Sequence, residues 1–251
     1  MVNRGNLLSR GWLLGYDMGK DPSKPYSMKS KETLFQHLVN PHFKVIVGMQ
    51  DGRYEQALKD GSDFLYADHS YFDRGWLKGH FRLVRNGIHL TRIVKNNHVD
   101  RLAKFGAVLQ PFKGKRGPKI GFLRTSKTNL AVHQLQDKEE ELIAKIRNST
   151  DREIVFRSKA DNPKSGVGPP LSEFLADCHA AVSLSTVAAV EAAVMGYPVF
   201  STPLCPSWPI HAGDDIDNPI IHDRYDWANS LASASWHWTE AEFINYLRYQ
   251  T

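Results

Sequence analysis

The 251-residue sequence has few of the features that identify many classes of protein. It contains two cysteines, Cys178 and Cys205, which are too few for a disulfide framework and are not spaced as metal ligands. Its longest apolar runs are too short to span a bilayer, and no apolar segment followed by a small-residue cleavage site occurs near the start. A disulfide-stapled secreted domain and a membrane span are therefore excluded. We expect a cytoplasmic protein with no membrane partner.

Several catalytic motifs are also absent from the sequence. It has no G-x-x-x-x-G-K-[ST], and the glycine-rich segment at 114–117 precedes an expected strand, whereas a P-loop follows one. It has no G-x-S-x-G, and its 11 histidines include no H-E-x-x-H pair. The sequence therefore predicts neither a P-loop nucleotidase nor a serine hydrolase of that type, and no metal site.

The charge balance favours an anionic partner. The formal net charge is +5, with 32 Lys and Arg against 27 Asp and Glu. The densest basic cluster contains Lys115 and Arg116, beside Lys113 and Lys119. Such a cluster is typical of a protein that contacts the phosphates of double-stranded DNA, but basic proteins that bind only small anions are also common. Both alternatives stay open, and nothing in the sequence indicates an oligomeric state.

Strand and helix patterns alternate along the chain, which predicts an α/β fold with mainly parallel sheets. After a helix at 31–38, apolar segments at 43–49 and 63–67 flank a short helix at 54–59, as in a βαβ unit. The segment 110–118 has the Pro, Gly and Lys content of a linker. We expect an N-terminal Rossmann-like half at 1–110, a C-terminal half at 118–223, and two helices at 224–251 that pack back on the body. In the C-terminal half the expected elements are strands at 120–123, 153–157 and 180–182 with helices at 138–147 and 170–176.

The stretch 180–203 is the most informative, because it reads as a buried strand, a loop of small residues, a helix and a second strand. Ser183, Ser185 and Thr186 supply hydroxyls where the helix begins, and Glu191 lies one turn further on. Together they suit a phosphorylated sugar donor, since a helix N-terminus attracts a diphosphate and a carboxylate accepts ribose hydroxyls. The alternative is that the serines only cap the helix and Glu191 is solvated.

Cations follow two other strands of the same half. Arg157 and Lys159 come at the end of the 154–156 strand, where they could stabilise a departing diphosphate. Arg124 follows the 120–123 strand and could add donors for phosphate. The alternatives are a solvated strand edge for the first pair and a polar loop without ligand for Arg124.

A third group of ionisable residues, 68–74, follows the strand expected at 63–67. Sugar transfer with inversion needs a base that takes the proton from the acceptor hydroxyl, and a carboxylate at a strand end can do this. Asp68 is the first candidate, followed by His69 and Asp73. The alternative is that Asp68 caps a turn, His69 and Tyr71 pack locally, and Asp73 pairs with Arg74 on the surface.

The stretch 183–199, read as Ser-x-Ser-Thr, then Glu-Ala-Ala, then Gly-Tyr-Pro-Val, resembles the nucleotide-sugar half of GT-B glycosyltransferases. The resemblance is closest to capsule-type sugar transferases and to small glycosyltransferase-like proteins of bacteriophages, some of which modify hydroxymethylated DNA bases. In these relatives an Asp-x-Gly/Ser/Ala-Tyr-Phe segment is followed by a Tyr/Phe-Arg element, and the corresponding segments here contain Asp68, Tyr71 and Arg82.

The resemblance implies two Rossmann-like halves, of which the N-terminal one is abbreviated. It implies a metal-independent transferase whose co-substrate is a nucleotide-diphosphate sugar, with a UDP-sugar expected, and no other cofactor. Tyr71, Arg82, Lys115 and Arg116 would bind the acceptor, for which a hydroxymethylated base in phage DNA is the first choice. A glycan acceptor, or a non-catalytic nucleotide- or DNA-binding protein, remains the alternative. The sequence names neither the sugar nor the stereochemical outcome.

Overall fold

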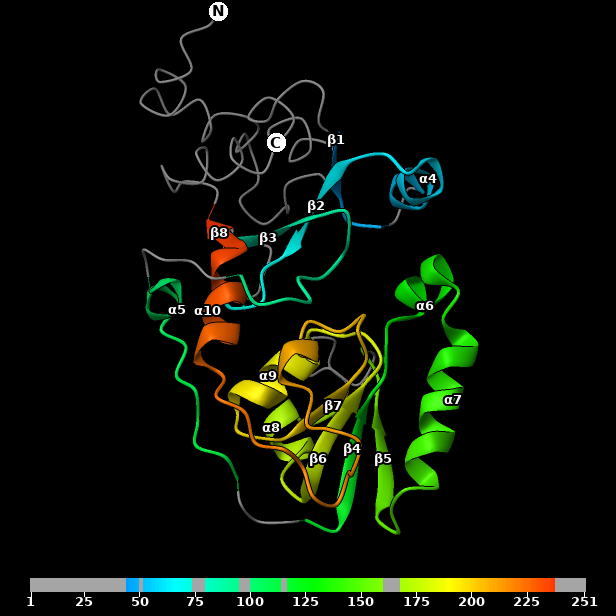
Figure 1. The fold of residues 1–251 in the computed structure, drawn as a ribbon, viewed down its shortest axis with the longest axis vertical. Coiled ribbons are helices and arrows are strands. Elements are labelled where there is room, and N and C mark those ends of the chain that lie inside the picture. Colours follow the sequence, from blue (N-terminus) through cyan, green and yellow to red (C-terminus); the bar gives the residue numbers. More distant parts are fainter. Residues whose placement is uncertain are drawn as a thin grey trace, which may run out of the picture. The chain divides into compact units, whose positions relative to one another are not determined.

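Two α/β units make up the described part of the chain, and each is built on a four-stranded sheet (Figure 1). The structure, a computed structural model, describes residues 44–49, 52–73, 80–94, 100–113, 117–159 and 168–237. Unit 1 comprises Met1–Ile88 and Ala234–Thr251, and unit 2 comprises His89–Ser233. The helix expected at 31–38 lies outside the described residues, as does the segment 238–251.

Unit 1 has a mixed sheet with the strand order β1-β2-β3-β8. Its elements are β1 (Lys44–Val47), α4 (Arg53–Asp60), β2 (Phe64–His69), β3 (His80–Arg85) and β8 (Ser235–His237). The expected βαβ unit is confirmed, because β1 and β2 are parallel and α4 connects them. The pairings of β2 with β3 and of β3 with β8 are antiparallel. The link between β2 and β3 is shorter than the dozen or so residues that a parallel crossover needs.

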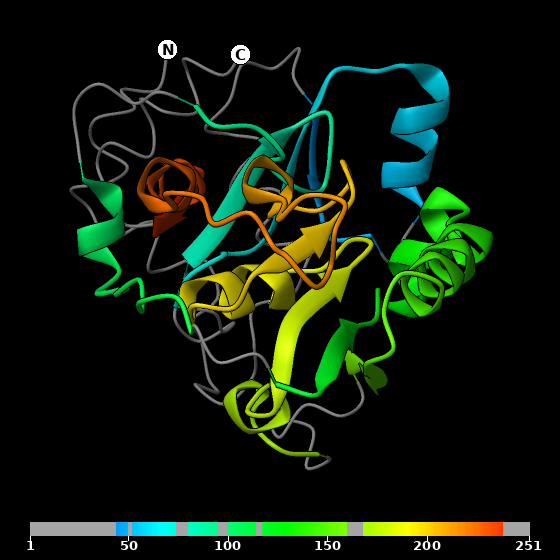
Figure 2. The same cartoon turned by 60° about the horizontal axis from the view of Figure 1, so that its bottom comes forward.

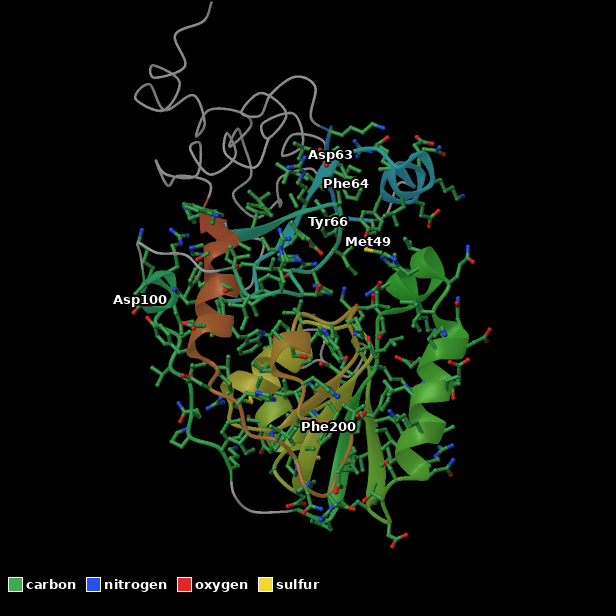
Figure 3. All side chains as sticks on the ribbon, viewed as in Figure 1. Met49, Asp63, Phe64, Tyr66, Asp100 and Phe200 are labelled. Atoms are coloured by element: carbon green, nitrogen blue, oxygen red, sulfur yellow. The ribbon has the colours of Figure 1, made fainter. Side chains whose placement is uncertain are left out.

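Aromatic side chains form the core between α4 and the sheet of unit 1. Tyr54 of α4 meets the rings of Phe64 and Tyr66 edge to face, with centroid distances of 5.5 and 5.2 Å. Figure 3 labels both of these β2 residues. The helix begins after Gly52 and ends at Gly61, and both glycines adopt the left-handed conformation. A glycine at each end thus limits the helix to the segment whose buried aromatic side chain contacts β2.

The end of the chain differs in part from the expectation. A helix is confirmed there, α10 (Tyr225–Ser233), but Ser235–His237 is a strand and not part of a second helix. Trp236 pairs with Phe81 on β3, and both side chains are buried. The correction has a physical reason, since the free edge of β3 offers this segment backbone hydrogen bonds that its own sequence pattern does not reveal.

Unit 2 contains an all-parallel sheet with the strand order β5-β4-β6-β7. The strands are β4 (Lys119–Leu123), β5 (Glu153–Arg157), β6 (Cys178–Ser183) and β7 (Val199–Ser201). The helices are α5 (Arg101–Lys104), α6 (Lys127–His133), α7 (Gln136–Arg147), α8 (Leu171–Phe174), α9 (Ala188–Val194), the 3-10 helix η4 (Trp208–Ile210) and α10. The expected alternation of strand and helix is confirmed, and α6 is an additional helix that was not predicted from the sequence.

The two faces of this sheet are covered by different elements (Figure 2). On one face, Ile143 and Ile146 of α7 pack in a core cluster with Phe122 and Val182 of the sheet. On the other face lie α8 and α9. Gly121 of β4 allows the close approach of α8, because a Cβ atom there would lie 2.6 Å from Cδ2 of Leu175. Burial on both faces explains why β4, β6 and β7 are mainly apolar, whereas the edge strand β5 is partly exposed.

Candidate functional site

The carboxyl ends of the strands of unit 2 form the edge at which open parallel sheets bind ligands. The chain passes from β4 to β5 on one side and then crosses to β6 on the other side of β4. The topological switch point therefore lies between β4 and β6. Arg124 and Thr125 follow β4 directly, and Ser185 and Thr186 follow β6 closely. The structure thus brings sequence segments about 60 residues apart to one place, as the hydrogen bond between Ser185 N and Thr125 Oγ1 shows.

Three polar side chains lie in one row across this edge. Arg157 ends β5, Ser183 ends β6, and Ser201 ends β7. Arg157 is in register with Leu123 of β4, and Ser183 is in register with Ser201. Side chains alternate along each strand, so the row shares the face of Gly121, which α8 covers. We call Arg157, Ser183 and Ser201 the edge row.

The edge row is buried, yet one side-chain polar atom of each of its residues lacks a nitrogen or oxygen partner among the described residues. Arg157 is only 9% exposed, and its Nη1 has no hydrogen-bond partner among the described residues. The guanidinium carbon lies 5.6 Å from the ring centroid of Phe174 on α8. Ser183 Oγ and Ser201 Oγ are likewise buried without a nitrogen or oxygen partner within the described ranges. Because buried polar groups are nearly always paired, three such atoms in one row suggest that a ligand supplies the missing acceptors.

A buried thiol lies beside Ser183. Cys205 is fully buried, and burial raises the pKa of its thiol, although the hydroxyls of Ser207 and Ser183 lower it in part. Its Sγ lies 3.2 Å from Ser207 Oγ and 3.7 Å from the carbonyl oxygen of Thr186. A neutral thiol in such a setting is a packing residue and not a nucleophile.

The switch-point loops are joined by a buried network that the sequence did not reveal. Glu139 of α7 is 2% exposed, and its Oε1 accepts the backbone N–H of Thr125 at 2.8 Å. Asn129 of α6 donates to Ser185 Oγ at 3.1 Å, while its own Oδ1 has no partner among the described residues. One signal was available in the sequence: Glu139 stands at helical spacing from the apolar Ile143 and Ile146, which places a carboxylate on the buried face.

Arg124 has partners within the protein. Its guanidinium lies 3.5 Å from Glu139 and 3.9 Å from Glu140, and its Cζ lies 5.0 Å from the ring centroid of Phe156. The side chain is 39% exposed. A phosphate could bind Arg124 only in competition with these two carboxylates, which sets it apart from Arg157.

The remaining donor-site candidates surround the start of α9. Thr186 Oγ1 accepts the N–H of Ala188 at 3.3 Å, so the seven-residue helix has one of its first N–H groups already satisfied. Glu191 lies in the first turn, is half-buried and has contacts of its own. Lys159 is exposed two residues after the end of β5. Of the candidates in unit 2, the edge row therefore has the buried polar atoms without a nitrogen or oxygen partner in the described ranges, and the start of α9 does not.

In unit 1, Asp68 belongs to a charged network on β2 and β3. Its Oδ2 accepts Arg82 Nη2 at 2.9 Å and Tyr66 Oη at 3.1 Å, and its Oδ1 accepts the N–H of His69 at 2.7 Å. Burial alone would raise the pKa of Asp68, but Arg82 and these hydrogen bonds hold it below its ordinary value. Asp68 and His69 lie within β2 and do not follow it. The carboxylate is therefore ionised at neutral pH and fixed in position.

Arg82 connects the candidates of unit 1. It is 4% exposed and donates to the carbonyl oxygens of Ile88 and His69 besides Asp68. Its Cζ lies 5.5 Å from the ring centroid of Tyr71, which is also buried. Asp73 lies 3.2 Å from Nδ1 of His80. Lys115 and Arg116 lie outside the described residues, so the structure does not describe these two candidates.

Lowering the pH below about 4 is expected to destabilise unit 1 through Asp68. Because the folded-state pKa is lowered, the unfolded chain takes up the proton first as the pH falls. The stabilisation by the Asp68 carboxylate is complete above its ordinary pKa and is lost as the pH falls toward its pKa in the folded state. Denaturation midpoints from pH 7 to pH 3 should show Asp68→Asn approaching the wild-type protein as the pH falls. A constant difference between the two proteins would contradict this prediction.

The fold and the edge row define the class as an α/β protein with a doubly wound parallel sheet and polar groups at its carboxyl edge. No protein-family model matches the chain, and no curated protein matches it. None of the helices in the described ranges is long and apolar enough to cross a membrane. No group of three or more potential metal ligands occurs in the described part of the chain.

Proposed function

We propose that the chain is a glycosyltransferase of the GT-B type whose unit 2 binds the diphosphate of a nucleotide sugar at the edge row. The observation that carries the proposal is Arg157, a buried cation whose Nη1 has no partner within the described ranges. It ends a strand at the carboxyl edge of a parallel sheet, and the same edge carries two buried serine hydroxyls on β6 and β7. A guanidinium suits two phosphate oxygens, and the hydroxyl of Ser183, the nearer of the two along the sheet, can donate to a third.

The proposed chemistry needs no metal to stabilise the leaving group. When the bond between the anomeric carbon and the diphosphate breaks, negative charge develops on the phosphate oxygens. Arg157, with Lys159 near the end of the same strand, would stabilise that charge in the transition state. Glu191 would accept the ribose hydroxyls, and a UDP-sugar is the expected donor.

Asp68 is the proposed base for the acceptor hydroxyl. Its carboxylate is ionised at neutral pH and held by Arg82, Tyr66 and the His69 N–H, which supports a fixed proton acceptor. The lowered pKa makes it a weak base, which suits a proton transfer that occurs late, as the bond to the sugar forms. In the GT-B arrangement that the resemblance implies, donor and base come from different halves.

The proposed acceptor is a hydroxymethylated base in double-stranded DNA, supported by the net charge of +5. A glycan acceptor predicts the same donor site without salt-sensitive DNA binding. A non-catalytic binding protein predicts nucleotide binding without turnover. Asp68→Asn separates a transferase from a non-catalytic binding protein, because only a transferase has a turnover to lose, and it should lose it while keeping its nucleotide affinity.

The donor site is tested by thermal shift with UDP, GDP, ADP, CDP, dTDP and their sugar derivatives. A ligand that binds only the folded protein raises the melting temperature by mass action. We expect one nucleotide series to raise it, and Arg157→Met to abolish the shift while leaving the ligand-free protein about as stable, since methionine is apolar and fills a similar space. Arg147→Met is the matched control, because Arg147 is exposed at the C-terminal end of α7. The absence of a shift with every compound would overturn the proposal.

A further inference from the structure

An exposed aromatic ring stands beyond the edge row, on the far side of β7. Trp208 begins η4 and is 38% exposed. Its indole stacks on the imidazole of His211, with ring centroids 5.0 Å apart and an angle of 29° between the planes. Large aromatic side chains are usually buried, so a stacked and partly exposed ring is a candidate contact for a planar ligand.

His211 holds this ring in place. Its Nδ1 accepts the backbone N–H of Ser201, the edge-row residue of β7, at 3.0 Å, and its carbonyl oxygen lies 3.0 Å from His222 Nε2. Its ring also meets Phe200, which Figure 3 labels, edge to face at 5.9 Å. Burial lowers the pKa of His211. The imidazole is therefore neutral at neutral pH, and the stack is tied directly to the strand that ends in Ser201.

The loop that carries Trp208 is also bound to the switch-point loop after β6. Thr202 Oγ1 donates to the carbonyl oxygen of Leu184 at 2.7 Å, and Ser185 Oγ donates to that of Leu204 at 3.2 Å. Cys205 Sγ contacts the carbonyl oxygen of Thr186 at 3.7 Å. These contacts make the segment 202–208 a fixed extension of the carboxyl edge, as a preorganised subsite requires.

The spacing fits a nucleotide laid along the edge. Arg157 and Ser201 are separated by three strand intervals, or roughly 14 Å. A ligand with its diphosphate at Arg157 and its chain running toward Ser201 would bring its other end to the β7 side, where Trp208 lies. A ribose and a base extend over a comparable length.

We propose that the exposed indole of Trp208 stacks on the nucleobase of the donor, so that this ring, supported by His211, forms the base subsite of unit 2. The inference rests on the proposed function and names the part of the ligand that the β7 side binds. Stacking tolerates any base, because every base has a π-face. The subsite supplies affinity for the nucleoside, and the edge row supplies affinity for the diphosphate.

The test compares a ligand that has a base with one that lacks it. Affinities for UDP, GDP, ADP, CDP, dTDP and inorganic pyrophosphate are measured by calorimetry. We expect Trp208→Ala to weaken the best nucleoside diphosphate by about tenfold and to leave pyrophosphate unchanged. Trp208→Phe keeps a ring and should lose little. Ile221→Ala, at an exposed apolar position of the same unit, is the control and should change neither affinity.

The outcomes separate the two proposals. If Trp208→Ala leaves nucleoside diphosphate binding intact while Arg157→Met abolishes it, the base subsite is wrong and the donor site stands. If Trp208→Ala weakens pyrophosphate as much as the nucleotide, the ring has only a structural role and the subsite is wrong. If the wild-type protein binds pyrophosphate as tightly as every nucleoside diphosphate, the subsite is also wrong. If it binds none of these compounds, the proposed function fails, and the subsite with it.

Discussion

Replacing Arg82 by methionine is expected to lower the free energy of unfolding of unit 1 by about 3–5 kcal/mol, since breaking a buried charge pair leaves an uncompensated charge. The guanidinium is 4% exposed and donates to Asp68, to the carbonyl oxygen of His69 and to that of Ile88. Methionine removes all three donors at once. Two carbonyl oxygens and one carboxylate would then remain without these donors.

Arg85 provides a matched control on the same strand. It forms a two-pronged ion pair with Asp63, but the two side chains are 47% and 43% exposed. Arg85→Met should therefore cost much less stability than Arg82→Met, because water screens the exposed pair. Urea denaturation followed by circular dichroism measures both variants. Equal losses for Arg82→Met and Arg85→Met would contradict the role assigned to burial.

A double variant tests whether the cost arises from the unpaired charge. In Asp68→Leu/Arg82→Met both charged groups are removed, so no unpaired carboxylate is left at this site. We expect the double variant to recover part of the stability that Arg82→Met alone loses. If the double variant loses more free energy of unfolding than the two single variants lose together, the pair acts through packing and not through charge.

The parallel sheet of unit 2 could be predicted from the sequence because its two central strands, β4 and β6, are buried on both faces. Segments such as 180–182 and 120–123 are short and almost wholly apolar, and helices separate them. Polar residues at strand ends then fall at one edge by topology alone, which is why Arg157 and Ser183 were found. Ser201 was missed because nothing in its own segment marks it. Its part in the edge row follows from register with Ser183.

The sheet of unit 1 was harder to predict because its pairings join distant segments. The 80–85 segment mixes charged and apolar side chains, and its partner β8 lies some 150 residues further along the chain. Propensity is local, whereas the pairing of β3 with β8 depends on backbone groups that only the folded unit brings together. The Asp68–Arg82 pair has the same origin, since the antiparallel register places these two residues opposite each other.

The buried groups at the switch point escaped prediction for another reason. Glu139 lies in a helix rich in charged residues, where a carboxylate is expected to be solvated. Its burial is explained by what it binds, the Thr125 N–H and the Arg124 guanidinium. Both partners lie after β4, so the role of Glu139 appears only once α7 is packed on the sheet.

Gly196→Ala is expected to destabilise unit 2 by about 2–5 kcal/mol, the sum of left-handed strain and overpacking. Gly196 follows α9 with φ near 92°, a conformation that side chains rarely adopt. A Cβ atom there would also lie 2.2 Å from the carbonyl oxygen of Pro111. That oxygen belongs to a backbone segment that Lys113 N holds to Gly196 O at 3.0 Å. The clash can be relieved only by moving this segment.

Two other glycines separate strain from collision, because each has a positive φ but meets different surroundings. At Gly52 a Cβ atom would have nothing within 4 Å, so Gly52→Ala should show strain alone, about 1–2 kcal/mol. At Gly213 the nearest atom is Cδ1 of Ile220 at 3.0 Å, the end of a flexible and exposed side chain that can move aside. We therefore expect Gly196→Ala to cost clearly more than Gly213→Ala in the same unit. Similar losses at these two positions in urea denaturation would show that the segment of Pro111 moves as easily as a surface side chain, and that the connection it forms with the end of α9 is weak.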